Sequence, residues 1–123
     1  MRIRQIDGIT ALEYEHTDPV LTTPAQVVDL IGECFGTDAR LVIIPAARLA
    51  ADFFVLRTGF AGEVFQKFQN YHLRLAIVGD IEEHVAASNA LRDFVRETSR
   101  IGNHMFVADE AELTARLASP ARV

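Results

Sequence analysis

Apolar residues recur along the chain with two different spacings, which predict strands and helices in alternation. Residues 2–6 and 9–15 alternate apolar and polar positions on either side of Asp7-Gly8. Asp-Gly between two such runs is typical of a β-hairpin, because a type I′ turn needs positive φ at both central positions. The run at 41–44 is continuously apolar, and the runs at 73–78 and 104–108 are apolar except for Arg74 and His104, as expected of strands buried on both faces of a parallel sheet.

Segments with apolar residues three or four positions apart follow these runs and predict four main helices. The first begins after Thr23, because Thr23-Pro24-Ala25-Gln26 has the pattern of a capping box with proline at the first helical position. The others are expected at about 59–70, at about 88–100 and from Asp109 onward. The order β-β-α-β-α-β-α-β-α predicts an α/β fold with a mixed sheet of about five strands.

Length and composition predict one folded domain. The chain has 123 residues, half of them hydrophobic, and a formal net charge of −5. We expect residues 1–118 to form the domain and 119–123 to be a frayed tail. An acidic surface repels phosphate groups, so nucleic acid and membranes are not expected as partners. The apolar runs are too short for a membrane span or for the core of a signal peptide, and a cytoplasmic location is therefore expected.

The sequence gives no sign of metal or cofactor chemistry. Cys34 is the only cysteine, and no two of the four histidines lie three or four positions apart, as zinc-binding pairs commonly do. No Gly-Ser nucleophile elbow is present. We therefore expect no metal and no cofactor, and we favour a non-enzymatic function while leaving catalysis open.

Arg57-Thr58-Gly59 is the candidate binding site. This tripeptide precedes the helix expected at 59–70, where a guanidinium, a hydroxyl and free backbone amides can bind an anion or a partner. The alternative is that Thr58 only caps the helix while Arg57 pairs with Asp52 or Glu63.

Asp80 follows the strand at 73–78 and is expected on the same rim, because loops after the carboxyl ends of strands form the usual binding crevice of an open α/β sheet. The alternative for Gly79-Asp80 is turn chemistry. Asp109 follows the next strand and is best explained as a helix cap.

The segment at 45–58 is longer than most connections of its type and carries Leu49, Phe53 and Phe54. Such a loop either packs onto the core or offers an apolar contact surface. In the second case these three residues form an interaction loop or the interface of a homodimer.

The chain resembles an uncharacterised bacterial family, domain-of-unknown-function family 4180, over nearly its whole length. The resemblance rests on four runs: FFVLRTGFAGE at 53–63, QKF at 66–68, LAIVGD at 75–80 and LRDFVRE at 91–97. This family implies no biochemical activity.

The order of elements is also similar to that of the STAS domain of sulfate transporters and anti-sigma-factor antagonists. In that fold a regulatory Ser or Thr precedes the second helix, and Thr58-Gly59-Phe60 stands where Ser-Gly-Leu is usual. Leu56 and Arg57 replace an acid and a small residue, so the resemblance does not extend to phosphorylation of Thr58.

These observations favour a small cytoplasmic regulatory or protein-interaction module that binds a protein partner or a small anion at Arg57, Thr58, Gly59 and Asp80. Two alternatives remain open. One is a homodimer joined by its apolar loop, and the other is a small enzyme or ligand receptor that uses the same rim.

Overall fold

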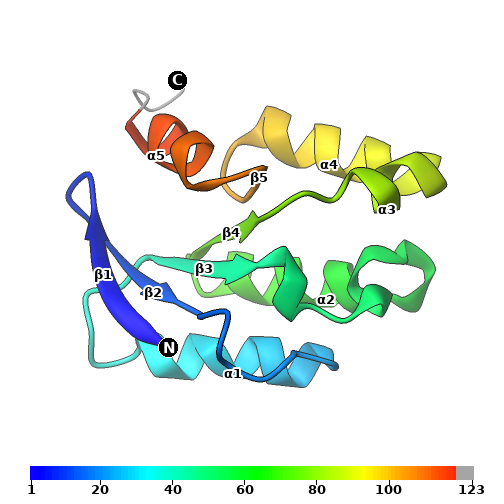
Figure 1. The fold of residues 1–123 in the computed structure, drawn as a ribbon. Coiled ribbons are helices and arrows are strands. Elements are labelled where there is room, and N and C mark those ends of the chain that lie inside the picture. Colours follow the sequence, from blue (N-terminus) through cyan, green and yellow to red (C-terminus); the bar gives the residue numbers. More distant parts are fainter. Residues whose placement is uncertain (119–123) are drawn as a thin grey trace.

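Residues 1–118 form a mixed five-stranded sheet with helices on both faces, as the computed structural model describes them (Figure 1). The strands lie in the sheet in the order of the sequence, and they are β1 (Arg2–Ile6), β2 (Ile9–Glu13), β3 (Leu41–Pro45), β4 (Arg74–Val78) and β5 (Met105–Val107). Strand β1 is antiparallel to β2, and each later pair is parallel. The predicted mixed α/β sheet is confirmed, whereas the tail expected at 119–123 lies outside the described residues.

The hairpin turn has the conformation that its sequence demands. Asp7 and Gly8 have φ values of 49° and 77°, so both central positions are left-handed as in a type I′ turn. The turn brings Ile6 opposite Ile9 and sets the register of the whole hairpin.

The four main helices are confirmed to within one or two residues. They are α1 (Pro24–Cys34), α2 (Phe60–Asn70), α4 (Asn89–Ile101) and α5 (Glu110–Ala118). A short helix, α3 (Glu82–Ala87), was not predicted, because none of its residues is buried and its apolar pattern is correspondingly weak. No helix in the described part of the chain is long and apolar enough to cross a membrane.

Side chains at the helix starts cap two of these helices as the sequence predicts. The Thr23 hydroxyl accepts from the Gln26 amide, and the Gln26 side chain accepts from the Thr23 amide, which completes the capping box. At α5 the Asp109 carboxylate accepts from the Glu112 amide at 2.9 Å. The Glu112 carboxylate in turn accepts from the Ala108 amide at 2.7 Å.

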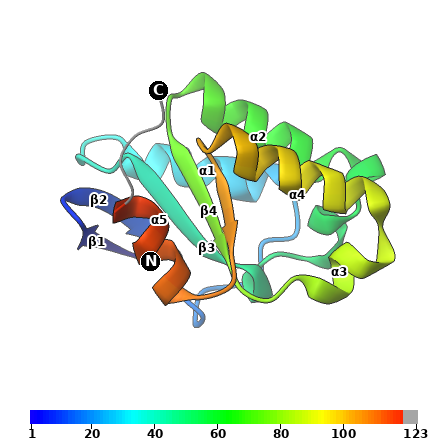
Figure 2. The ribbon, with the colours of Figure 1, turned by 90° about the horizontal axis from the view of Figure 1, so that it is seen from above.

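The sheet separates two apolar cores of unequal size. Helices α1, α2 and α4 contribute Leu30, Val64, Phe68 and Leu91 to the larger core on one face. Among the helices of residues 1–118, only α5 contributes to the smaller core on the other face, through Leu113 and Leu117. Figure 2 shows α5 across the sheet from α1 and α2. Because α5 has only nine residues, it covers only part of its face.

The long connection between β3 and α2 packs onto the larger core. It forms three short 3₁₀ turns, η1 (Ala46–Arg48), η2 (Ala51–Phe54) and η3 (Leu56–Thr58). Leu49, Phe53 and Phe54 are only 6%, 1% and 3% exposed. These three side chains therefore pack onto the core, as one of the two interpretations expected. They do not form the exposed contact surface or dimer interface of the other interpretation. The physical reason is the aromatic cluster that Phe53 forms with residues of α2.

Candidate functional site

The carboxyl ends of β2, β3, β4 and β5 meet at one edge of the sheet, because these four strands are parallel. A hollow of about 620 Å³ lies at this edge, and we call it the carboxyl-edge hollow. Its lining comprises Arg2, Glu13, Tyr14, Glu15, His16, Thr17, Ile43, Pro45, Val78, Gly79, Ala108, Asp109 and Glu110. This is the place where ligands usually bind to open α/β sheets.

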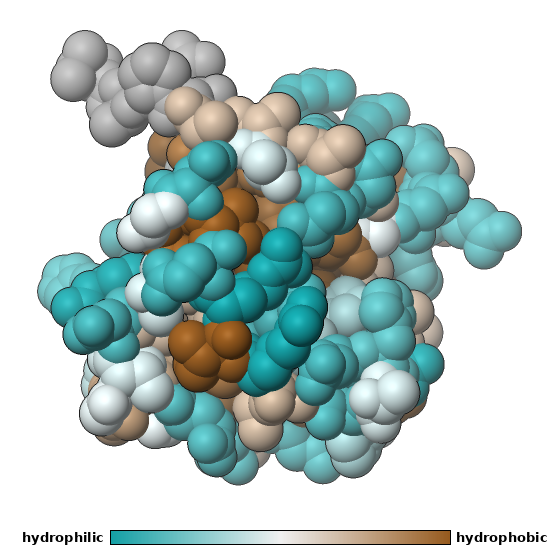
Figure 3. All heavy atoms as spheres, turned by 60° about the vertical axis from the view of Figure 1, so that its left-hand side comes forward, coloured by the Kyte–Doolittle hydropathy of each residue, from teal (hydrophilic) through white to brown (hydrophobic). Residues whose placement is uncertain are grey.

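The floor of the hollow is apolar and its rim is charged. Ile43 and Pro45 are buried, and Val78 is partly buried against the core beneath α5. Figure 3 looks at the molecule from the side of β1 and shows apolar surface between polar side chains.

Gly79 allows β4 to end close to η1. Its φ is +147°, and a Cβ built on it would lie 3.0 Å from the Cβ of Ala46. The Gly79 amide also donates to the Val107 carbonyl at 2.9 Å. Because L side chains rarely adopt this φ, glycine is required where β4 and β5 reach the hollow.

An ion-pair network joins three elements at the rim. Arg2 donates through Nε to Glu13 Oε1 at 2.8 Å. Arg4 donates to Glu13 Oε2 at 2.9 Å and to Glu110 Oε2 at 2.8 Å, which links β1 and β2 to α5. Burial acts to raise the pKa of Glu13, but Arg2 and Arg4 outweigh it, so that the pKa lies below its ordinary value. Glu13 is therefore a structural carboxylate held in its charged form.

The two predicted rim aspartates act within their own turns. The Asp80 Oδ1 atom accepts from the Glu82 amide at 2.9 Å, which matches the turn alternative. Asp109 caps α5 and also lines the hollow. Asp80 does not line the hollow, although its neighbour Gly79 does.

Arg57, Thr58 and Gly59 stand at the start of α2, outside the lining of the hollow. The Thr58 hydroxyl lies 2.7 Å from the Val55 carbonyl oxygen and 2.9 Å from that of Asp52, and it accepts from the Phe60 amide at 3.2 Å. These contacts engage the hydroxyl within the loop. The residue at the N-cap is Gly59, with φ of 78°.

Arg57 is exposed, and among residues 1–118 it forms no ion pair. The pairing with Asp52 or Glu63 is therefore absent from the structure. The guanidinium is available to an anion that approaches the start of α2.

Sequence reasoning missed the contribution of the hairpin to the hollow. Glu13, Tyr14, Glu15 and His16 lie there because β2 pairs in parallel with β3, with Leu12 opposite Val42. The signal was present in the order of elements, since β2-α1-β3 is a crossover unit like the later ones. The hairpin signal indicates only the pairing of β1 with β2, and it does not indicate the pairing of β2 with β3.

Metal ligands are not grouped in the described part of the chain. Within residues 1–118 no set of three or more His, Cys, Asp or Glu side chains is arranged to hold a metal ion. The hollow therefore offers apolar contact, charge and hydrogen bonds.

The fold and this edge define a small mixed α/β domain with an open hollow at the carboxyl ends of its strands. The family model of DUF4180, a domain of unknown function, matches residues 6–117. The chain therefore belongs to the DUF4180 family, as the four quoted runs predict. No curated protein and no solved structure matches the chain, so the STAS resemblance stays a prediction.

Proposed function

We propose that this protein is a small cytoplasmic regulatory or protein-interaction module that binds its partner at the carboxyl edge of the sheet. The observation that carries the proposal is the carboxyl-edge hollow, because it combines an apolar floor with a charged rim. Interfaces of this kind place apolar anchors at the centre and polar groups around them.

The charges of the rim favour a basic partner. Four carboxylates line the hollow, from Glu13, Glu15, Asp109 and Glu110. Arg2, Arg4 and the N-terminal ammonium of Met1 pair with three of them, so the rim keeps a net negative charge. The overall charge of −5 acts in the same direction over a longer range. We therefore expect the partner to insert an apolar side chain above Ile43 and Val78 and to present lysine or arginine to the rim.

Arg57 gives the same edge a second mode of binding. It is exposed and unpaired within residues 1–118, at the start of a helix whose first amides carry partial positive charge. A small anion, or an acidic group of the partner, is the expected occupant. Thr58 and Gly59 shape this start, and Asp80 borders the neighbouring loop.

A charge reversal at the hollow tests the main proposal. Glu15→Lys changes a rim carboxylate, and Glu33→Lys makes the same change on the exposed surface of α1. Proteins captured from an extract of the source organism would be identified by mass spectrometry, and their affinities would then be measured with purified components. We expect one partner to bind the wild type and Glu33→Lys equally and to bind Glu15→Lys at least about tenfold more weakly. Equal binding to all three removes the hollow as the site.

A titration with inorganic phosphate tests the anion mode separately. Amide resonances of residues 57–62 should shift in the wild type and much less in Arg57→Ala. Thr58→Ala should have a smaller effect, because the hydroxyl is already engaged by the loop. Identical titrations of wild type and Arg57→Ala exclude this mode.

A small-molecule receptor is the second candidate function. The hollow's volume of about 620 Å³ falls within the range of small-molecule sites, about 300–1,000 Å³. A receptor would bind a small apolar amine with the same loss in Glu15→Lys, whereas a protein-interaction module would show that loss only with its macromolecular partner.

A further inference from the structure

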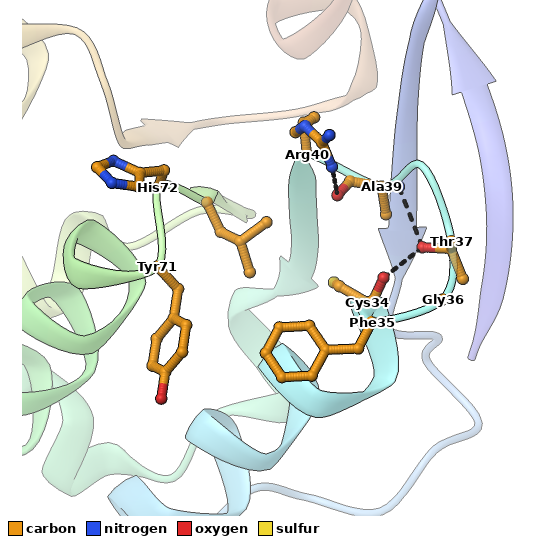
Figure 4. Close-up of a pocket in the computed structure, with 9 residues that line it drawn as sticks. Cys34, Phe35, Gly36, Thr37, Ala39, Arg40, Tyr71 and His72 are labelled. Atoms are coloured by element: carbon orange, nitrogen blue, oxygen red, sulfur yellow. Dashed lines mark hydrogen bonds between the residues drawn. The ribbon is translucent and has the colours of Figure 1, made fainter.

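A second hollow lies at the opposite, amino edge of the sheet, between the ends of α1 and α2. It has a volume of about 430 Å³ and is lined by residues 34–37, 39–40 and 71–73. Figure 4 shows the side chains that surround it, and we call it the amino-edge pocket. Neither the carboxyl-edge hollow nor the start of α2 shares any residue with it.

The pocket has a buried apolar floor and two exposed aromatic walls. Cys34, Ala39 and Leu73 are buried. Phe35 and Tyr71 are 65% and 53% exposed, with ring centroids 6.0 Å apart and ring planes inclined by 55°. Figure 4 shows the Phe35 ring directed toward that of Tyr71. An apolar group that enters the pocket would remove much of this aromatic surface from water.

Arg40 gives the pocket a positive charge that no acidic residue in the described part of the chain neutralises. Its Nη1 atom donates to the Ala39 carbonyl at 3.3 Å, and no ion pair of Arg40 exists within residues 1–118. Within residues 1–118 no Asp or Glu lines the pocket, and His72 lines it beside Arg40. A guanidinium presents paired N–H donors that match a carboxylate.

The polar groups at the end of α1 that line the pocket are already engaged. The Thr37 hydroxyl donates to the Cys34 carbonyl at 2.7 Å and accepts from the Ala39 amide at 3.0 Å. The Thr37 amide also donates to the Cys34 carbonyl, so the last carbonyl of α1 does not face the pocket unpaired. Burial raises the pKa of the Cys34 thiol, and the charge of Glu33 raises it further, so the thiol stays neutral. Selectivity for charge therefore rests on Arg40.

We propose that the amino-edge pocket binds a small aromatic carboxylic acid. The carboxylate pairs with the Arg40 guanidinium, and the aromatic body lies on the floor formed by Leu73 and Ala39, against the rings of Phe35 and Tyr71. The volume of about 430 Å³ suits a ligand of one or two rings. This site goes beyond the partner site proposed at the other edge.

The test is a titration of the isotopically labelled full chain with 2-naphthoate, followed by amide chemical shifts. We expect saturable shifts concentrated in residues 34–40 and 71–73. The neutral analogue 2-naphthalenemethanol should bind more weakly to the wild type. Shifts that do not saturate, or that lie mainly outside these segments, overturn the proposal.

Two exposed variants separate the roles of charge and ring. Arg40→Gln should weaken 2-naphthoate binding about tenfold or more, as expected for loss of a charge-assisted pair, and should leave binding of the alcohol unchanged. Phe35→Ala should weaken both ligands. The matched controls are Arg96→Gln and Ile101→Ala, exposed positions of α4 that do not line the pocket, and both should bind like the wild type.

Three results would refute the assignment. The first is wild-type affinity in Arg40→Gln, and the second is equal affinity of the wild type for the acid and the alcohol. The third is a set of shifts in residues 34–40 that depends on protein concentration without any ligand. Sedimentation would then show that a second copy of the chain, and not an acid, covers the aromatic pair.

Discussion

Replacing Phe53 with alanine should destabilise the protein strongly, because the loop that carries Arg57 and Thr58 is anchored by this ring. Phe53 is 1% exposed. Its ring centroid lies 5.1 Å from that of Phe54, 5.3 Å from that of Phe60 and 6.2 Å from that of Phe65. The ring thus joins η2 to two successive turns of α2.

The magnitude follows from burial and ring contacts. Truncating a buried phenylalanine to alanine costs about 3–5 kcal/mol. Aromatic pairs contribute roughly 0.5–1.5 kcal/mol each beyond their buried area, and the loss of three of them places Phe53→Ala toward the upper end. A domain of this size has a total stability of roughly 5–15 kcal/mol, so the variant should fold with a much reduced margin.

Urea denaturation followed by far-UV circular dichroism measures this loss. With an m-value of about 1–3 kcal/mol per molar urea, the midpoint should fall by at least about 1 M. Val55→Ala is the control, because Val55 belongs to the same loop and is 36% exposed; we expect it to cost less than about 1 kcal/mol. If Phe53→Ala costs as little as the control at an unchanged m-value, the loop is not anchored on the core and the reasoning fails.

Three further predictions concern the pH dependence, the hollow and the first helix. The His104 Nδ1 atom accepts from the Leu75 amide at 3.1 Å, and burial, together with the charge of Arg74, lowers the pKa of His104 in the folded state. The unfolded chain therefore binds this proton first, so the free energy of unfolding should fall as pH drops below about 6.5, until the lowered folded pKa is reached. An unchanged slope in His104→Phe between pH 5 and 7.5 would contradict this. Gly79→Ala should destabilise the folded protein by roughly 1–3 kcal/mol, because of the positive φ of Gly79 and its closeness to Ala46. Gly62→Ala should instead stabilise the protein by up to about 1 kcal/mol, because Gly62 lies in a helix with open space around it. Thermal unfolding should therefore shift the two midpoints in opposite directions, and shifts in the same direction would be inconsistent with the structure. Thr23→Ala should cost about 1 kcal/mol through loss of the capping box, and thermal unfolding at the same midpoint as the wild type would show that the cap contributes nothing.

The elements that sequence reasoning could predict are those whose signals are local. Asp7-Gly8 specifies its turn through φ alone, and Thr23 with Gln26 specifies the start of α1 through side chains one turn apart. The run at 41–44 is buried throughout, and its continuous apolar pattern needs no knowledge of its neighbours. In these cases the residues that determine the structure are adjacent in sequence.

The residues of the apolar loop do not by themselves indicate whether its side chains face the core or the solvent. Phe53 and Phe54 are hydrophobic in either environment, and their burial depends on Phe60 and Phe65 of α2 and on His84 of α3, whose ring stacks on Phe54 at 4.3 Å. Composition indicates how much apolar surface a loop carries. It does not indicate which distant element will cover that surface.

The predicted site residues Arg57, Thr58, Gly59 and Asp80 do not line the hollow, and their role in binding stays a prediction. The rule for carboxyl ends of parallel strands places Asp109 correctly, since it lines the hollow. Most of the rim comes from Arg2, Glu13 and Glu15 instead, and their position depends on the parallel pairing of β2 with β3. That pairing joins segments separated by the whole of α1, so spacing within either segment cannot reveal it.

The two edges of the sheet differ in charge, and this difference implies that they select different ligands. Among residues 1–118, the lining of the carboxyl-edge hollow includes four carboxylates and one arginine, whereas that of the amino-edge pocket includes Arg40 and no carboxylate. Because the whole protein carries −5, a basic partner is attracted by both the net charge and the rim. An acid is repelled by the net charge and attracted only within about one Debye length, about 8–10 Å, of Arg40. Added salt therefore weakens the basic partner's binding more steeply than the acid's, since for the acid it screens a repulsion as well as an attraction.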